Sequence, residues 1–251
     1  MSQVIHSLPF EIAAPGLYIL EGDLSGPAGE YSLKVTAPAV TVDLAGHTLA
    51  SQADIAILLC AAEFSLKNGT LKAEQLALAP EPHVRADHCV LENLRVRGGL
   101  FVGGQHLYAK NCMVQGGTYG IKADQQARLH DCEVSECLLG IEVGAGSTVQ
   151  DCRVQACEEG VYAYGARELP SHLERVIVVE CQGLGLRLDG PGVLERCEAH
   201  NNGLSEPAGG ILAGPATVVK ECEAYGNQGG DIGVVEPCEL SENLTSDGSG
   251  R

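Results

Sequence analysis

The chain has no tryptophan, and aromatic residues make up only 4% of its 251 residues. Its core therefore cannot be built around large rings, although 45% of the residues are hydrophobic and the composition is not that of a disordered chain. Valine, leucine, isoleucine, alanine and cysteine remain as core residues. Glycine, at 32 residues, is well above its average share of about 7%. Small, uniform residues of this kind suit tightly stacked, similar layers.

Long apolar segments are also absent. No stretch reaches the roughly 18 apolar residues of a membrane span, and the opening residues lack the basic and apolar regions of a secretory signal. Eleven cysteines without an export signal favour free thiols in a reducing compartment. We therefore expect a cytoplasmic protein that does not bind a membrane.

Positive charge is scarce as well, since 16 Lys and Arg against 33 Asp and Glu give a net charge of −17. Such a surface repels phosphate, which argues against nucleic-acid binding. Residues 84–130 are the exception, with six basic residues against three acidic ones. We expect an anionic ligand, such as an acidic oligosaccharide, to bind there, with Lys110, Arg128 and His130 as ligand-binding residues.

The sequence does contain an internal repeat of 20 residues. Residues 111–123 read NCMVQGGTYGIKA, residues 131–143 read DCEVSECLLGIEV, and residues 151–163 read DCRVQACEEGVYA. Each copy starts with Asn or Asp followed by Cys, and near its end Gly is followed by Ile or Val. Weaker copies with small insertions continue in both directions, as expected of a solenoid.

Apolar residues alternate within each copy over runs of three to five residues, which is the periodicity of strands and not of helices. A unit of 20 residues with three short strands is one turn of a parallel β-helix, whose strands pair with their copies about 4.8 Å away. We predict an all-β, right-handed parallel β-helix, a solenoid of about ten coils. Residues 1–40 are expected to form an N-terminal cap, 41–243 the coils and 244–251 a polar C-terminal tail.

The recurrent Asn/Asp-Cys-x-Val and Gly-Ile/Val steps resemble the right-handed β-helix repeat family, which shares the architecture of pectate lyases, polygalacturonases, uronan epimerases and tailspike proteins. Residues 15–20 and 40–49 resemble the first coil of such proteins, and the resemblance extends over roughly residues 12–243. It implies a fold more than an activity, because one fold supports many functions. The Asp-Asp, His-Gly and Arg-x-Lys signatures of polygalacturonase-type enzymes are absent, which argues against that type of hydrolysis.

Cysteines and the residues that start each unit recur with the repeat. Free cysteine is commonly buried, and the closely spaced Cys pairs of zinc sites are absent, so we expect structural thiols and no metal site. The cysteines form two sets: Cys112, Cys132, Cys152, Cys197, Cys222 and Cys238, and Cys137, Cys157 and Cys181.

The Asn and Asp residues that start the units are expected to form turns. Stacked Asp131 and Asp151 leave calcium as an alternative, because neighbouring carboxylates attract a cation.

One column of polar residues follows the Gly-Ile step on four successive units, namely Lys122, Glu142, Tyr162 and Arg187. Each lies between apolar residues, so alternation turns it outward. Such a set suits β-elimination or C5 epimerisation of a uronate, in which Arg187 or Lys122 would bind the carboxylate and Tyr162 or Lys122 would transfer the proton. The alternative is an ordinary solvated sheet face with cross-strand charge pairs.

Two classes of function therefore stay open. The first is a carbohydrate-active protein: a lyase, an epimerase or a module that binds an acidic sugar, working without a cofactor unless calcium binds. The second is a noncatalytic scaffold whose flat sheet faces or ends bind another protein or a second copy of the chain. The mixed charge and tyrosine of the polar column favour the first class, and the missing catalytic signatures favour the second.

Overall fold

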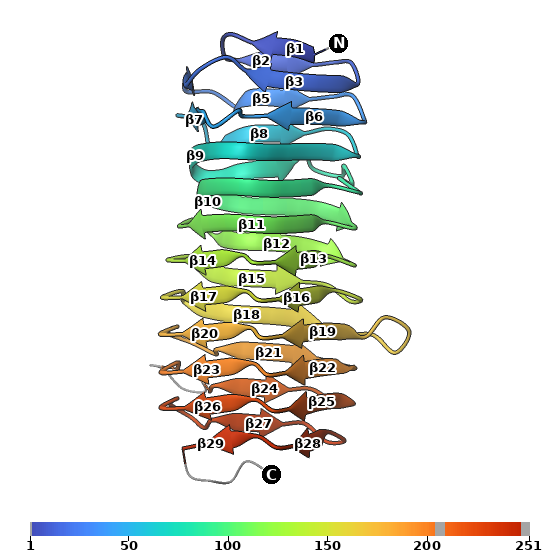
Figure 1. Cartoon of the computed structure of the whole chain (residues 1–251), viewed down its shortest axis with the longest axis vertical. Helices are drawn as coiled ribbons and strands as arrows, with labels where there is room; N and C mark the ends of the chain where they lie inside the picture. The colour runs from blue at the N-terminus through green and yellow to red at the C-terminus, as the bar shows by residue number, and fades with distance from the viewer. Residues whose placement is uncertain (1, 204–208, 247–251) are drawn as a thin grey trace.

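The computed structural model, which describes residues 2–203 and 209–246, is a right-handed parallel β-solenoid of about 11 turns (Figure 1). The predicted fold is confirmed, and the predicted number of about ten coils is close to the observed one. The named strands pair in parallel, each with its counterpart one coil further along the axis. The described residues contain no helix, and hence none that could cross a membrane.

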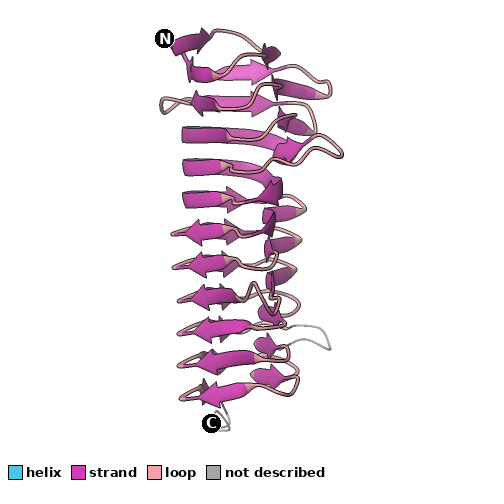
Figure 2. Cartoon of the chain, turned by 90° about the vertical axis from the view of Figure 1, so that its right-hand side faces the viewer, coloured by secondary structure: helices cyan, strands magenta, loops and turns pink. Residues whose placement is uncertain are grey.

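Three parallel sheets form the sides of the solenoid (Figure 2). Sheet 1 contains β1 (Ser2–Ile5), β3 (Gly16–Leu20), β6 (Val40–Asp43), β13 (Arg128–His130), β16 (Thr148–Gln150), β19 (Ser171–Glu174), β22 (Gly192–Glu195), β25 (Thr217–Lys220) and β28 (Glu239–Ser241). Sheet 2 contains β4 (Leu24–Gly26), β7 (Thr48–Ser51), β14 (Glu133–Ser135), β17 (Arg153–Gln155), β20 (Ile177–Val179), β23 (Glu198–His200), β26 (Glu223–Tyr225) and β29 (Leu244–Thr245). Sheet 3 contains β2 (Phe10–Ile12), β5 (Tyr31–Val35), β8 (Ile55–Leu59), β12 (Tyr119–Gln125), β15 (Leu139–Val143), β18 (Glu159–Tyr164), β21 (Leu186–Asp189), β24 (Ile211–Ala213) and β27 (Ile232–Val234).

Three longer strands run around the corners and belong to more than one sheet. They are β9 (Phe64–Pro80), β10 (Val90–Gln105) and β11 (Tyr108–Gln115). Strand pairing continues without a break across residue 40, where the sequence suggested the end of a cap. At the other end, β29 lies at the start of the predicted tail, and residues 247–251 of that tail lie outside the described residues.

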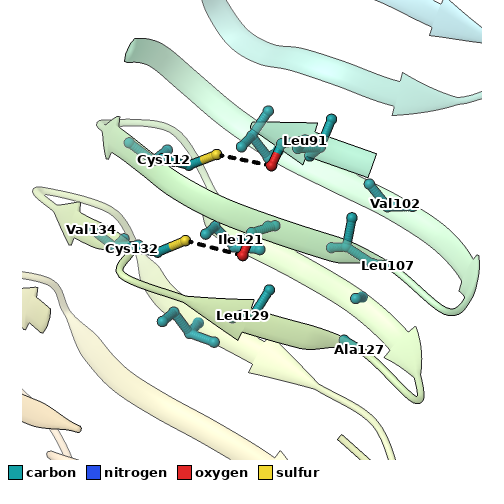
Figure 3. Packing of buried hydrophobic residues seen from close by; sticks show 14 of the residues in the cluster. Leu91, Val102, Leu107, Cys112, Ile121, Ala127, Leu129, Cys132 and Val134 are labelled. Atoms are coloured by element: carbon teal, nitrogen blue, oxygen red, sulfur yellow. Dashed lines mark hydrogen bonds between the residues drawn. The ribbon is translucent and has the colours of Figure 1, made fainter. Parts of the chain in front are cut away.

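Alternation along each short strand directs one set of side chains into a single core. In β15, Ile141 and Val143 are fully buried while Glu142 between them is not. The eleven cysteines are free, and nine of them are buried. Figure 3 shows the thiols of Cys112 and Cys132 directed into the interior, where each donates to a backbone carbonyl of the preceding coil. These thiols are core residues, and the cytoplasmic location stays a prediction.

The corner between sheets 1 and 2 explains why five units, from Asn68 to Asp151, start with Asn or Asp; in later units the same corner carries Arg175, Arg196 and Glu221. Residues at this corner have a left-handed backbone, with φ of 59° at Asn68, 55° at Asn93 and 52° at Asn111. Asn and Asp tolerate that conformation better than other residues with a side chain. The asparagines also bond to one another, since the amide of Asn111 donates to Asn93 at 2.9 Å and that of Asn93 donates to Asn68 at 3.1 Å.

The glycine of the Gly-Ile step is required by the close approach of consecutive coils. A Cβ atom added to Gly140 would lie 2.6 Å from the carbonyl oxygen of Gly160 and 2.4 Å from a methyl group of Val154. Gly120 and Gly160 have the same surroundings on neighbouring coils. The repeat therefore preserves glycine where sheet 2 turns into sheet 3.

Candidate functional site

The outward face of sheet 3 carries the polar column that the sequence singled out. Its register aligns Lys122 with Glu142, Glu142 with Tyr162, and Tyr162 with Arg187 on β12, β15, β18 and β21. Phe101 of β10 precedes Lys122 in this column. Alternation thus predicts the placement of all four residues, while their roles in a reaction stay predictions.

The upper half of the column is an ion pair beside two aromatic rings. Lys122 Nζ lies 2.8 Å from Glu142 Oε2, 4.3 Å from the ring centre of Tyr119 and 5.8 Å from that of Phe101. Burial lowers the pKa of Lys122, but the hydrogen bond and charge of Glu142 outweigh it and the pKa is raised. These contacts favour the charged form of Lys122, and its role as a base stays a prediction.

The lower half of the column is organised by Asp189, which the sequence reasoning missed. Tyr162 donates its hydroxyl to Asp189 Oδ2 at 2.6 Å, and Arg187 donates Nε to Oδ1 at 3.0 Å. A second nitrogen of Arg187 lies 2.7 Å from Oδ2, and the guanidinium lies 4.8 Å from the ring centre of Tyr162. Asp189 lies two residues after Arg187 on one strand, so the alternation that identified Arg187 also pointed to Asp189.

The contacts with Asp189 change the pKa of the Tyr162 hydroxyl, and with it the ability of Tyr162 to transfer a proton. Burial and the hydrogen bond to Asp189 raise the pKa of the Tyr162 hydroxyl above its ordinary value. Burial also acts to raise the pKa of Asp189, but its hydrogen bonds from Arg187 and Tyr162 outweigh this and lower it. A base for uronate chemistry needs a lowered pKa. The contacts of Tyr162 therefore do not supply the lowered pKa that such a base needs.

A polar pocket lies at one end of sheet 3, beside the column. Its volume is about 460 Å³, and it is lined by Arg85, Gln105, Lys122, Ala123, Asp124, Gln125, Glu142, Gly144 and Tyr164. Tyr164 precedes the loop of residues 165–170, which projects from the solenoid between β18 and β19 (Figure 1). Asp124 stays open to solvent, yet the partial burial of its carboxyl raises its pKa. Asp124 and Glu142 thus differ in environment within one pocket.

A larger and more apolar groove lies at the other end of the same strands. Its volume is about 700 Å³, and its walls include Tyr119, Leu138, Leu139, Tyr162, Leu184, Arg187 and Leu212, with Glu158 and Glu159 at one side. Leu138 is 48% exposed. The groove and the polar pocket lie on either side of the column.

The basic residues predicted to bind an anion lie on sheet 1 and not on this face. Lys110 pairs in register with His130, and Arg128 precedes it on β13. Lys110 and Arg128 are exposed. His130 lies between two carboxylates, with Nδ1 2.7 Å from Asp131 and Nε2 3.5 Å from Asp151. The surroundings of His130 are therefore acidic, which favours a cation over an anion.

His130, Asp131 and Asp151 together offer ligand atoms that lie within 4.8 Å of one another. Arg175 already holds Asp151 through two contacts of 2.5 and 2.9 Å, and this contact lowers the pKa of that carboxyl. A metal ion would have to displace the guanidinium. Calcium also prefers oxygen ligands, whereas this group includes an imidazole. Calcium binding stays a prediction without further support from this geometry.

Comparison with known proteins gives a match in fold. No protein-family model and no curated protein sequence matches the chain. Among solved structures, the crystal structure of the Dettilon tailspike protein is similar, with a TM-score of 0.56 and 10% sequence identity. The match covers 98% of this chain and 53% of that one, so this chain spans about half the length of the tailspike protein. The chain therefore shares the β-helix architecture of a tailspike protein.

Proposed function

We propose that the outward face of sheet 3 binds an oligosaccharide. The observation that carries this proposal is the distribution of aromatic residues. The chain has only seven Tyr and three Phe, and four of these ten lie on this face of neighbouring coils: Phe101, Tyr119, Tyr162 and Tyr164. Aromatic side chains join a large apolar surface to a polar tip. That combination suits a sugar ring, which has apolar faces and a hydroxylated rim.

The charges of the face support a neutral ligand over a uronate polymer. Lys122 already faces Glu142, and Arg187 already faces Asp189. The adjacent groove adds the carboxylates of Glu158 and Glu159. Because each cation has an acidic partner, the face is not electropositive, and an acidic sugar gains little from it. The β-helix architecture, which includes sugar-processing proteins, supports an oligosaccharide ligand but not its charge.

The test is a binding screen with neutral and acidic oligosaccharides, followed by calorimetry on the best ligand. Tyr162→Ala and Tyr119→Ala are expected to weaken binding about tenfold each, since each removes a stacking surface. Tyr108→Ala is the matched control, because Tyr108 is a partly exposed tyrosine on sheet 1. Equal loss in all three variants, or no binding of any oligosaccharide, would reject the proposal.

Cleavage of the bound glycan is a second candidate, supported by the different environments of Asp124 and Glu142. A carboxyl whose pKa is raised by burial stays protonated longer and can act as an acid. Glu142 lies 2.8 Å from Lys122 and is the candidate base or nucleophile. Glycosidases pair two carboxyl groups in this way.

Cleavage is tested by incubating the best oligosaccharide with the protein and measuring new reducing ends. Asp124→Asn and Glu142→Gln are each expected to lower the rate by a factor of about 100 or more while leaving binding in place. A wild-type protein that binds the glycan and never cleaves it would reject cleavage and leave the binding proposal standing.

A further inference from the structure

The outward face of sheet 2 carries two columns of side chains that run along the solenoid from β9 to β26. The first column contains, in order, Thr70, Arg95, Met113, Glu133, Arg153, Ile177, Glu198 and Glu223. The second column contains Lys72, Arg97, Gln115, Ser135, Gln155, Val179, His200 and Tyr225. Basic residues gather toward the N-terminal end and acidic residues toward the C-terminal end.

The first column is complementary to itself when it is read from its centre, between β14 and β17. The two central residues are Glu133 and Arg153, a pair of opposite charge. One coil further out on each side, two apolar residues correspond, namely Met113 and Ile177. The next step outward pairs Arg95 with Glu198, again of opposite charge, and the outermost step sets Glu223 against the uncharged Thr70.

The second column is less regular. Its central residues, Ser135 and Gln155, are polar and uncharged, and the next step sets polar Gln115 against apolar Val179. The step after it sets Arg97 against His200, whose side chain is buried and stacked on Tyr225. The outermost step pairs Lys72 with Tyr225, a cation with an aromatic ring. Such contacts are attractive when the cation lies over the ring face. Neither column sets two acidic residues, or two Lys or Arg residues, against each other when its order is reversed.

A two-fold axis along the strand direction brings these residues together. It turns a second copy of sheet 2 to face the first and reverses the direction of the solenoid, so that each residue meets its counterpart across the centre. Contacts of this kind are isologous and close as a dimer. A parallel arrangement instead places Arg95 against Arg95 and Glu198 against Glu198, and like charges in contact are unfavourable.

We infer that two copies of the chain associate through sheet 2 as an antiparallel dimer. Four charges of this face lack partners within one copy: Lys72, Arg95, Arg97 and Glu223 form no ion pair with residues 2–203 or 209–246, whereas Glu198 lies 3.1 Å from His200. Their opposite charges lie several coils away on the same face and cannot reach them. Met113 and Tyr225 are 49% and 48% exposed, and both become covered in the dimer.

The expected interface is small. Eight coils at a spacing of about 4.8 Å give a length of about 40 Å, and three-residue strands with their corner residues give a width of about 15 Å. The area is then about 600 Å² on each copy, which is at the lower end for specific complexes. The dimer should therefore dissociate on dilution, and salt should weaken it, because charged pairs contribute to it. The inference does not depend on glycan binding, since sheet 3 stays uncovered.

The test is sedimentation of the full chain over a range of concentrations in low and in high salt. The wild type is expected to shift from monomer to dimer as concentration rises. Arg95→Glu and Glu198→Arg each place like charges in contact twice in the symmetric dimer, and each is expected to raise the dissociation constant about tenfold or more. Arg128→Glu is the matched control, since it makes the same charge change at an exposed position on sheet 1.

Mixing the two variants gives the decisive measurement. A copy with Arg95→Glu and a copy with Glu198→Arg have opposite charges at both contacts, so an equimolar mixture should dimerise although neither variant does so alone. Circular dichroism checks that both variants are folded. A wild type that stays monomeric at all concentrations, variants that still dimerise, or a mixture that stays monomeric would each overturn the inference.

Discussion

Sheets 2 and 3 are built on the same coils, yet their outward faces differ in how charge is arranged. On sheet 3, unlike charges occupy neighbouring coils, as in the pair of Lys122 and Glu142 at 2.8 Å. On sheet 2, Arg95 and Glu198 are separated by several coils. Arg95 forms no ion pair with the described residues of one copy, and Glu198 has only the imidazole of His200 beside it, at 3.1 Å. Adjacent coils are about 4.8 Å apart, so charges pair within the chain only over one step. Separated charges are left available to another molecule.

The largest effect on stability is expected from a substitution that disrupts the packing between coils, which supports both faces. Gly140 lies where sheet 2 turns into sheet 3, against the backbone of Gly160. Gly140→Ala forces the coils apart and should lower the free energy of unfolding by about 3 kcal/mol. Urea unfolding measures this loss. Gly29→Ala is the control, because no atom lies within 4 Å of a Cβ at that position, and an equal loss there would contradict the packing explanation.

One substitution on each face should next separate the two proposed properties, dimer formation on sheet 2 and glycan binding on sheet 3. Met113→Asp buries a charge against Ile177 of the second copy and should weaken the dimer by a factor of about 30. It should leave glycan affinity unchanged. Tyr119→Ala should do the reverse, lowering glycan affinity about tenfold and leaving the dimer intact. Sedimentation and calorimetry on both variants check this, and a variant that impairs both properties would show that the faces are coupled.

Acid should weaken the cluster that Asp189 forms with Tyr162 and Arg187 on sheet 3, here called the Asp189 cluster. The pKa of Asp189 is lower in the folded chain than its ordinary value of 3.8. Its stabilising contribution is therefore complete above about pH 4 and is lost as the pH falls through the folded pKa. Asp189→Asn should cost less than about 1 kcal/mol at pH 7, since the side chain is 32% exposed and solvent screens it.

Two measurements test the acid prediction. Unfolding by urea at several pH values should show the difference between wild type and Asp189→Asn shrinking below pH 4. An absorbance titration should show the pKa of Tyr162 falling in the variant, because one of the causes that raise it is removed. A difference in stability that is constant with pH would contradict the ion pair.

The smallest effect is expected at the corner between sheets 2 and 3. Ala156 is exposed and has a φ of 53°, in the left-handed region that favours glycine. Ala156→Gly relieves this strain and should raise the free energy of unfolding by about 0.5 kcal/mol, after the entropy cost of glycine. Thermal unfolding measures the gain. Ala50→Gly, within strand β7, should instead lower stability by about 0.5 kcal/mol.

The sequence predicted the solenoid because each coil repeats the same local solution. The Gly-Ile step, the Asn or Asp at the corner and the alternating apolar residues are all visible within 20 residues. Alternation also identified the outward column from Lys122 to Arg187 in its correct register. Asp189 was missed although its spacing from Arg187 already placed it on the same face.

The partners of these residues were not predictable in the same way. The basic stretch at 84–130 suggested one anion site, yet the structure divides it among three sheets: Arg95 and Arg97 lie on sheet 2, Lys110 and Arg128 on sheet 1, and Lys122 on sheet 3. A charge count along the chain averages over faces that point in different directions. The aromatic cluster of sheet 3 was hidden for the same reason, since its members are spread over some 60 residues of sequence.

The sequence by itself thus determined the coil, its three short strands, its corners and the direction of each side chain, because these depend on interactions between residues close in the chain or one repeat apart. Only the tertiary structure decided which outward residues meet: the Asp189 cluster, the two hollows beside the sheet 3 column, and the self-complementary columns of sheet 2. Such contacts depend on the register between coils and on the small insertions that shift it. Those quantities are fixed by packing of the whole stack and not by any one repeat.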